Sequence, residues 1–154
     1  MGTYFLDSSA IIKRYVPEQG HAWIATLCSL TQGHKLYISQ AILVEVVAGI
    51  CRRAREQSIT IADRDRFIDT FRQDSQTAYG IRLVTTTMYN FAGDLCRSYR
   101  LRAYDAVQLA CALDLRNETL ADQAPTPIFV SADINLSNIA ATERLSIENP
   151  NNYP

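Results

Sequence analysis

Short segments rich in branched and aromatic residues recur along this chain of 154 residues, and helix-length stretches separate them. Residues of these types favour buried strands, so the pattern predicts strands over residues 3–6, 36–39, 81–84 and 128–131. The predicted helices cover residues 8–16, 18–31, 40–57, 61–78, 87–99 and 105–117. Strands that alternate with helices in this way indicate an α/β fold, in which a central parallel sheet carries helices on both faces.

The number of domains follows from length and composition. A chain of 154 residues that is 47% hydrophobic fits one compact domain with a sizeable core. A weaker β-like run over residues 145–148 brings the expected sheet to four or five strands. We therefore expect one domain over residues 1–148, followed by a mobile tail over residues 149–154, which is rich in Asn and Pro.

Charge and cysteine content restrict the class of protein. A net charge of −1 gives no general attraction to nucleic acid, so any such contact must come from a local basic strip or through metal ions. The four cysteines are far apart in helix-like apolar stretches, which predicts buried free thiols in a reducing cytosol. Neither His21 nor His34 has the spacing of a zinc ligand. With no secretory signal and no apolar run near about 20 residues, we expect a soluble, cytoplasmic protein without a membrane partner.

Acidic residues stand beside segments that should be buried, at Asp7, Glu45, Asp105 and Asp133. Burying an unpaired charge is costly, so their positions need an explanation. Asp7 and Asp133 follow predicted strands, at the sheet edge where open α/β folds form their ligand crevices. Glu45 lies about one turn into a predicted helix, and Asp105 opens another. All four can therefore converge on one end of the sheet.

Helix capping is the simpler explanation for three of these acids. Asp7, Asp105 and Asp133 each precede or open a helical stretch, where a carboxylate is favoured. Glu45 has no such explanation, because no Lys or Arg lies three or four residues from it on the helix surface. Glu45 could still be a solvated residue at the edge of an apolar face.

A cluster of four carboxylates points to a bound cation. Clustered carboxylates repel one another and raise one another's pKa unless a cation neutralises them. Oxygen ligands select hard ions, so Mg²⁺ is the expected occupant, with Mn²⁺ as a substitute. Two such ions about 4 Å apart can activate a water molecule and stabilise the leaving oxygen of a phosphodiester. The acids therefore favour hydrolysis of a nucleic-acid backbone.

Basic residues flank the acids along the sequence. Lys13 and Arg14 follow Asp7, while Arg52 lies about two turns beyond Glu45 on the same predicted helix. Arg102 precedes Asp105. These four are candidate phosphate contacts, although a solvated helix face is the better default explanation for most such residues.

Four segments together match a known pattern: FLDSSA at 5–10, VEV at 44–46, LRAYDA at 101–106 and VSAD at 130–133. Their order and spacing resemble the PIN-domain ribonucleases, most closely the VapC toxins of bacterial toxin–antitoxin pairs. The resemblance implies that Asp7, Glu45, Asp105 and Asp133 are the catalytic, metal-binding carboxylates. We predict that Asp7 and Asp105 hold the principal Mg²⁺, with Glu45 and Asp133 completing its shell directly or through water. It gives Ser9 and Ser131 supporting polar roles. It also implies an RNA substrate, a protein antitoxin that occludes the acidic site, and a homodimer.

One departure from the family pattern bears on the number of ions. Family members often carry a further acid shortly after the last one, whereas Asn135 and Asn138 follow Asp133 here. An amide oxygen brings no charge, so one ion is better supported than two.

Other functions fit the sequence less well. A phosphatase with an aspartyl nucleophile needs a second Asp where Ser9 stands, and a phosphoacceptor receiver domain needs an acidic pair and a lysine. The main alternative is a catalytically silent PIN-like module that binds RNA or protein. Metal binding without cleavage of any RNA would favour that alternative.

Overall fold

The five strands of the structure form one parallel sheet. A computed structural model describes residues 1–154, and its strands are β1 (Thr3–Leu6), β2 (Lys35–Ser39), β3 (Gly80–Arg82), β4 (Ile128–Val130) and β5 (Ser146–Glu148). Their order in the sheet is β3-β2-β1-β4-β5, and every neighbouring pair is parallel. The predicted α/β fold is therefore confirmed, with the weak fifth strand included.

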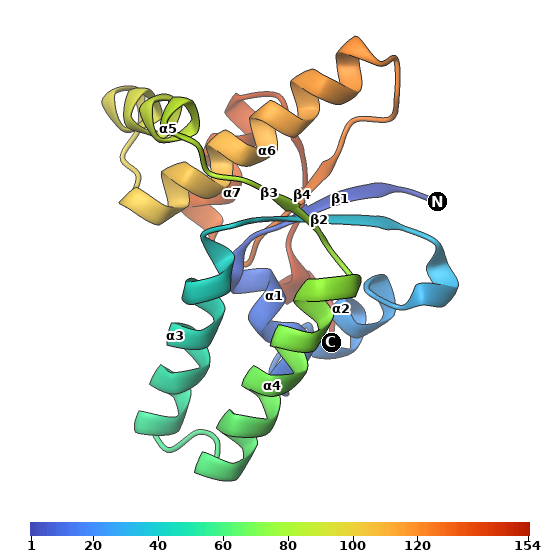
Figure 1. The fold of residues 1–154 in the computed structure, drawn as a ribbon, viewed down its shortest axis with the longest axis vertical. Coiled ribbons are helices and arrows are strands. Elements are labelled where there is room, and N and C mark those ends of the chain that lie inside the picture. The colour runs from blue at the N-terminus through green and yellow to red at the C-terminus, as the bar shows by residue number, and fades with distance from the viewer.

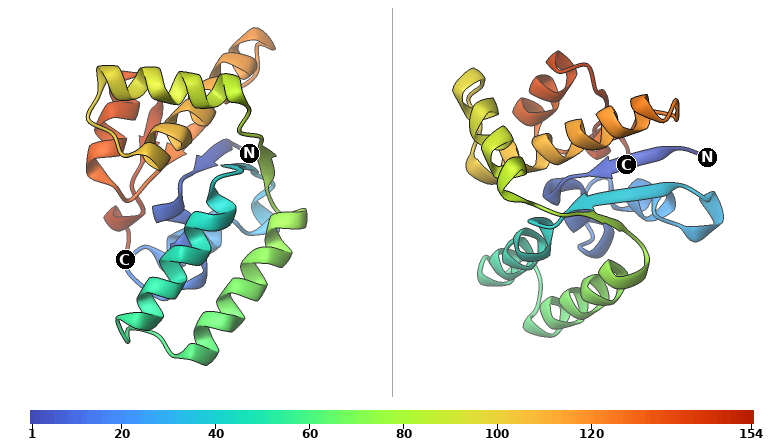
Figure 2. Two further views of the ribbon diagram at one scale, coloured as in Figure 1. Left: turned by 60° about the vertical axis from the view of Figure 1, so that its left-hand side comes forward. Right: turned by 45° about the horizontal axis from the view of Figure 1, so that its top comes forward.

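Helices cover both faces of this sheet, as Figure 1 shows. On one face lie α1 (Ser8–Tyr15), α2 (His21–Leu27), α3 (Ile42–Arg55) and α4 (Ile61–Thr77). On the other lie α5 (Thr86–Ser98), α6 (Ala103–Ala121) and α7 (Ile134–Thr142). Two 3₁₀ turns, at Leu30–Gln32 and Pro150–Asn152, complete the secondary structure. Both views in Figure 2 show α3 and α4 side by side as a helical hairpin.

The central strands divide their side chains between two hydrophobic cores. Because successive residues of a strand point to opposite faces, Phe5 packs under α5, α6 and α7 while Leu6 packs against α1 and α3. On β4 the pair Phe129 and Val130 repeats this division. Phe5 is opposite Phe129 in the β1–β4 register, and their rings stack with centroids 6.0 Å apart. Strands buried on both faces explain why the sequence shows continuous apolar runs.

The helix boundaries differ from the sequence predictions at three places. The predicted helix over residues 18–31 is α2 followed by a separate 3₁₀ turn. Helix α6 begins at Ala103, so Asp105 lies inside its first turn and Arg102 occupies the N-cap position. Helix α7 is missing from the predicted helices, since nine residues are too few to show a clear helical period.

The cysteine prediction is wrong at one position. Cys28 and Cys111 are buried, and desolvation raises the pKa of these thiols to about 11 and about 12. Cys51 is half-buried, but Cys96 is exposed on α5. Amphipathic helices place cysteines on either face, which spacing alone cannot resolve.

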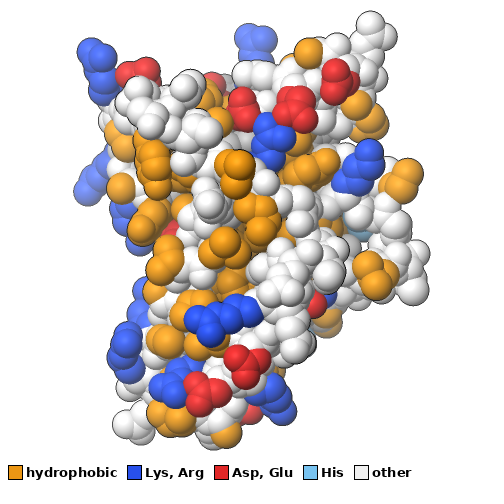
Figure 3. Space-filling model, viewed as in Figure 1, with side chains coloured by type: hydrophobic (Ala, Val, Ile, Leu, Met, Phe, Trp, Pro, Cys, Tyr) orange, Lys and Arg blue, Asp and Glu red, His pale blue; other side chains and the backbone are white.

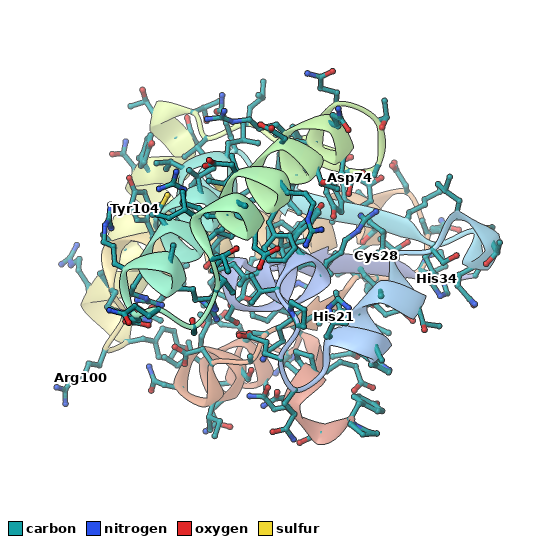
Figure 4. The ribbon with its side chains drawn as sticks, turned by 90° about the horizontal axis from the view of Figure 1, so that it is seen from below. His21, Cys28, His34, Asp74, Arg100 and Tyr104 are labelled. Carbon is teal, nitrogen blue, oxygen red and sulfur yellow. The ribbon has the colours of Figure 1, made fainter.

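The two histidines make unrelated contacts on different parts of the molecule (Figure 4). Nδ1 of His21 pairs with the backbone oxygen of Lys13 at 2.6 Å. The ring of His34 accepts a hydrogen bond from the backbone nitrogen of Gly2 at 3.0 Å. Each ring therefore has a local structural partner.

None of the helices combines the length and the apolar character needed to cross a membrane.

The C-terminal tail, predicted to be mobile, packs against α2 in the structure. Pro150 is buried, and the ring of Tyr153 stacks on Trp23 with centroids 4.5 Å apart. The Tyr153 hydroxyl donates to Glu148 at 3.0 Å. The Asn- and Pro-rich composition gives no sign of the stacking on Trp23, because Trp23 and Tyr153 lie more than a hundred residues apart along the chain.

Gly20→Ala is expected to loosen this tail and to lower stability by about 2 kcal/mol or more. Gly20 has a φ of +82°, which disfavours a side chain, and an added Cβ would collide with the backbone carbonyl of Pro150. The sole tryptophan, Trp23, makes fluorescence a clean monitor of denaturant unfolding. Gly33→Ala is the matched control: its φ is +64°, but the added Cβ would meet nothing nearer than Met1 Sδ at 3.7 Å. Equal losses in the two variants would contradict the role of the tail contact.

Candidate functional site

The predicted acids lie at the carboxyl edge of the sheet, on the left of Figure 1. Asp7 follows β1 directly and caps α1, whereas Asp133 follows β4 and caps α7. Glu45 is in the first turn of α3, and Asp105 is in the first turn of α6. Parallel strands place all their carboxyl ends at one edge, so segments distant in sequence meet here.

Asp7 is the most buried of the four acids, with 2% of its surface exposed. Its Oδ1 accepts from the backbone nitrogen of Ala10 at 2.9 Å and from Ser9 Oγ at 2.7 Å, and its Oδ2 accepts from Ser131 Oγ at 2.7 Å. Desolvation raises the pKa of Asp7 to about 6, although the hydrogen bonds from Ser131 and Ser9 oppose the shift. The charge on Asp105 raises the pKa further. Asp7 does cap α1, but capping does not explain why a charged residue stands at this buried position.

Ser9 and Ser131 fasten Asp7 to the segment that carries Asp133. Ser9 Oγ accepts from the backbone nitrogen of Ala132 at 2.8 Å, and Ser131 Oγ accepts from that of Asp133 at 3.1 Å. Each hydroxyl therefore donates to Asp7 and accepts from the loop between β4 and α7. This arrangement fixes the distance between the two carboxylate-bearing segments.

Glu45 is half-buried and receives a hydrogen bond from a residue that the sequence predictions missed. The side-chain amide of Gln108 on α6 donates to Glu45 Oε2. Desolvation raises the pKa of Glu45, and the charges on Asp7 and Asp105 raise it further. A single amide inside an otherwise apolar, buried helical run was the signal that could have revealed Gln108.

Asp105 and Asp133 share one cation within the chain. The guanidinium of Arg102 donates to Asp105 Oδ2 at 2.8 Å and to Asp133 Oδ2 at 3.3 Å. The Arg102 side chain is 80% exposed, so these ion pairs are weak and easily exchanged. Arg102 is the one predicted phosphate contact that lies among the acids.

The four carboxylates act on one another electrostatically without forming a closed cage. Asp105 raises the pKa of both Asp7 and Glu45, and Asp133 and Glu45 both act on Arg102. As the side chains lie, however, no three Asp, Glu, His or Cys groups stand close enough to hold a metal ion. The acids are therefore near neighbours at one edge, and they would have to close in around an ion.

An open cleft of about 670 Å³ lies beside Asp105 and Asp133. Residues 100–102 and Asn135 complete its lining. The Asn135 amide donates to the backbone oxygen of Arg100 at 3.2 Å, which ties the start of α7 to this loop. In Figure 4 the Arg100 side chain extends away from the body of the molecule on the same side.

The remaining predicted phosphate contacts are placed differently from expectation. Lys13 is buried and its ammonium contacts Glu18 at 3.1 Å, while Arg14 pairs with Asp74 at 3.0 Å. Both charges are already paired within the chain, so neither is free to contact a phosphate. Arg52 is exposed on α3 and lies 4.0 Å from Glu56. Figure 3 shows Lys and Arg side chains along the left margin of the molecule, where α5 and α3 lie in the same view in Figure 1.

Ser131→Ala is expected to raise the pKa of Asp7 by about one further unit. The variant removes a hydrogen bond that stabilises the charged carboxylate, and such a bond contributes roughly 1.5–3 kcal/mol. Titration of the Asp7 carboxyl carbon by NMR measures the shift. Ser137→Ala removes another buried hydroxyl, one that bonds the Ser131 backbone oxygen at 3.4 Å, and should leave the Asp7 pKa unchanged. A lower Asp7 pKa in Ser131→Ala would contradict this account.

Comparison with known proteins identifies the family to which the chain belongs. The PIN domain matches residues 4–141, nearly the whole chain. The chain belongs to the PIN-domain family, as the sequence resemblance predicted. No curated protein matches the sequence closely.

Solved structures with the same fold include several toxin–antitoxin complexes. The chain is similar to one in VapBC2 from Rickettsia felis bound to a DNA fragment from its promoter, with 15% identity, a TM-score of 0.56, and coverage of 96% of this chain and 98% of that one. It is also similar to a chain in FitAcB from Neisseria gonorrhoeae, with 14% identity, a TM-score of 0.61, and coverage of 97% of this chain and 98% of that one. A chain in a toxin–antitoxin complex from Klebsiella pneumoniae is similar with 13% identity, a TM-score of 0.58, and coverage of 96% of this chain and 97% of that one. At these identities the likeness establishes the fold.

Proposed function

We propose that this protein is a metal-dependent endoribonuclease that acts as the toxin of a toxin–antitoxin pair. The observation that carries the proposal is the buried carboxylate of Asp7, which is coupled to Asp105 and Glu45 at the carboxyl edge of a PIN-domain sheet. A chain would not retain such a costly group for packing alone, because an uncharged cap would serve α1 equally well.

The donor set at the edge suits a hard divalent cation. All four groups are carboxylates, which fits Mg²⁺ or Mn²⁺. Asp105 Oδ1 accepts no hydrogen bond from the protein, and exposed Arg102 can move aside without disturbing the fold. Asp7 and Asp105 would hold the ion, with Glu45 and Asp133 completing the set directly or through water. We propose a single ion, because Asn135 and Asn138 stand where a further acid would supply the negative charge for a second one.

The chemistry is divided between the ion and the residues of the chain. When bound, the cation would neutralise the carboxylates, polarise a phosphodiester and promote attack by water. Ser9 and Ser131 keep Asp7 oriented and ionised, since both hydrogen bonds favour its charged form. Once released from Asp105 and Asp133, Arg102 is placed to grip a phosphate of the substrate, with Arg52 further along α3 as a second contact.

The same comparison supports one of the proposed partners. The similar structures are toxin–antitoxin complexes, which supports a protein antitoxin that covers the acidic edge. We also propose a homodimer that works in the cytoplasm, where the RNA substrate is found. Exposed apolar side chains near the start of α3 and after β3, at Leu43, Val44 and Leu83, supply surface for a protein partner. Light scattering on the purified protein measures its oligomeric state.

The deciding experiment is cleavage of total cellular RNA by the purified protein with Mg²⁺, Mn²⁺ or EDTA. We expect discrete fragments that require the metal and that disappear in Asp105→Asn, because the amide removes one charge from the cation site. Asp94→Asn is the control, since Asp94 is exposed on α5 and only loosely paired with Arg97 at 4.0 Å. Full activity in EDTA or in Asp105→Asn would overturn the proposal.

A catalytically silent module is the second candidate, and two observations favour it. Arg102 neutralises two of the four acids from within the chain, and no closed cage is preformed. In that case the protein would bind RNA or its partner at this edge without cleaving. Mn²⁺ binding by the wild-type protein, with no cleavage of any RNA tested, would establish this second function.

A further inference from the structure

A buried hydrogen-bonded chain reaches the acidic edge from inside the molecule. Gln108 on α6 is 1% exposed, and Ser39, the last residue of β2, is fully buried. Ser39 Oγ donates to Gln108 Oε1 at 2.9 Å, and Gln108 Nε2 donates to Glu45 Oε2. These two side-chain hydrogen bonds link β2 to α6 and α6 to α3.

The surroundings of Gln108 favour an apolar residue there. Its helical neighbours Ala106, Val107, Leu109 and Ala110 are all buried, and an amide in such a place is costly unless both its ends are bonded. Both ends are bonded here, and no buried side-chain polar atom of the chain lacks a partner. The bond from Nε2 goes to Glu45, one of the four acids at the carboxyl edge of the sheet.

Glu45 needs a restraint if it is to face the other acids. Its side chain is half-buried, and the negative charges on Asp7 and Asp105 oppose the presence of a third charge beside them. Gln108 follows Asp105 by three residues, so both lie on one face of α6. One face of α6 therefore carries Asp105 and also the amide that bonds Glu45 on α3.

We propose that Gln108, braced by Ser39, is a positioning residue that holds Glu45 toward Asp7 and Asp105. This inference rests on the proposed function and extends it, because Gln108 acts through Glu45 and touches neither ion nor RNA. The Ser39 hydroxyl occupies the amide oxygen, so the amide nitrogen faces the carboxylate. Groups of this kind behind metal-binding side chains typically contribute 10–100-fold in metal affinity.

The first test is Mn²⁺ affinity, measured calorimetrically on the full chain. Gln108→Met keeps the length and helical preference of the side chain but removes both hydrogen bonds. We expect it to bind Mn²⁺ about tenfold more weakly and to cleave RNA with a lower kcat and an unchanged KM. Ser75→Ala, which removes a buried hydroxyl bonded to the Phe71 backbone oxygen, is the control and should bind Mn²⁺ normally.

A double variant separates positioning from mere structural support. Gln108→Met leaves the Ser39 hydroxyl buried without a partner, and this alone lowers stability. Ser39→Ala combined with Gln108→Met removes that unpaired group, so we expect Tm in EDTA to recover while Mn²⁺ affinity stays weak. Recovery of both quantities together would overturn the proposal, because Gln108 would then serve the fold alone.

The effect must also pass through Glu45. In a Glu45→Ala background, Gln108→Met is expected to change Mn²⁺ affinity no further. An equal loss with and without Glu45, or normal affinity in Gln108→Met, would overturn the inference while leaving the nuclease proposal intact. A wild-type protein that binds no Mn²⁺ and cleaves no RNA would instead remove the proposed function, and the inference with it.

Discussion

Asp7→Asn is expected to reduce RNA cleavage by orders of magnitude and, in EDTA, to make the protein more stable. The substitution removes one negative charge from the carboxylates that we propose hold the cation. The same charge is a burden on the metal-free fold, because Asp7 is 2% exposed and no cation of the chain contacts it. Its pKa rises from the ordinary 3.8 to about 6, which corresponds to roughly 3 kcal/mol at neutral pH. Asparagine keeps an oxygen to accept from Ala10 and an amide to bond Ser131.

The pH dependence follows from the direction of this shift. The folded protein holds the Asp7 proton to a higher pH than the unfolded chain does, so between about pH 4 and pH 6 it binds more protons. Stability without metal should therefore fall as pH rises through this window and stay lowered above it. Asp7→Asn should lack this component of the pH dependence. Denaturant unfolding in EDTA at pH 4 and pH 7.5 measures both variants, with Asp94→Asn as the surface control.

Addition of Mg²⁺ should make the wild-type protein more stable than Asp7→Asn, the reverse of the order expected in EDTA. A ligand that binds only the folded state stabilises it by mass action, so wild type should gain stability with Mg²⁺ while Asp7→Asn should not. An Asp7→Asn protein that is less stable than wild type in EDTA would show that Asp7 serves chiefly as a cap. Wild-type cleavage by this variant would remove Asp7 from the site.

Phe129→Ala is expected to cost about 3–5 kcal/mol, the largest loss of stability for a single side chain outside the site. Phe129 is fully buried at the centre of the sheet and stacks on Phe5. Its loss leaves a cavity beneath α6 and α7 that neighbouring strands cannot close. For a chain of this length we expect Tm to fall by about 10 °C or more, as measured by calorimetry in EDTA.

The same variant should weaken the site indirectly. Ser131 lies two residues after Phe129 and hydrogen-bonds Asp7, so loosening the β1–β4 pair shifts that contact. Tyr89→Ala is the control, because Tyr89 is half-exposed on α5 and its removal should cost little. A Tm loss in Phe129→Ala no larger than that in Tyr89→Ala would contradict the packing account.

Sequence patterns sufficed for the strands and most helices because those patterns are local. Buried parallel strands read as apolar runs, and each of the five predicted strands lies where such a run occurs. Helix α7 and the packing of the tail are not visible in the sequence, for opposite reasons. The helix is too short to show a period, while the tail depends on Trp23 and Gly20, which are distant in sequence.

Only part of the candidate site can be predicted from the sequence. Strand ends identified Asp7 and Asp133, and an acid without a nearby base identified Glu45, because both signals are local. Gln108 was missed, since a lone amide in an apolar helix gives no sign of its partners. Lys13 and Arg14 were assigned to phosphate because they follow Asp7 in sequence, but α1 turns their side chains toward Glu18 and Asp74.

The sequence by itself determined the α/β class and the position of each acid at the end of a strand or the start of a helix. Those features depend on side-chain periodicity and on capping, which act over a few residues. Only the tertiary structure decided which charges are neutralised, because pairs such as Arg102 with Asp133 join segments far apart in the chain. It also decided how deeply Asp7 is buried, and desolvation is the property of the assembled fold that sets the energy of its charge.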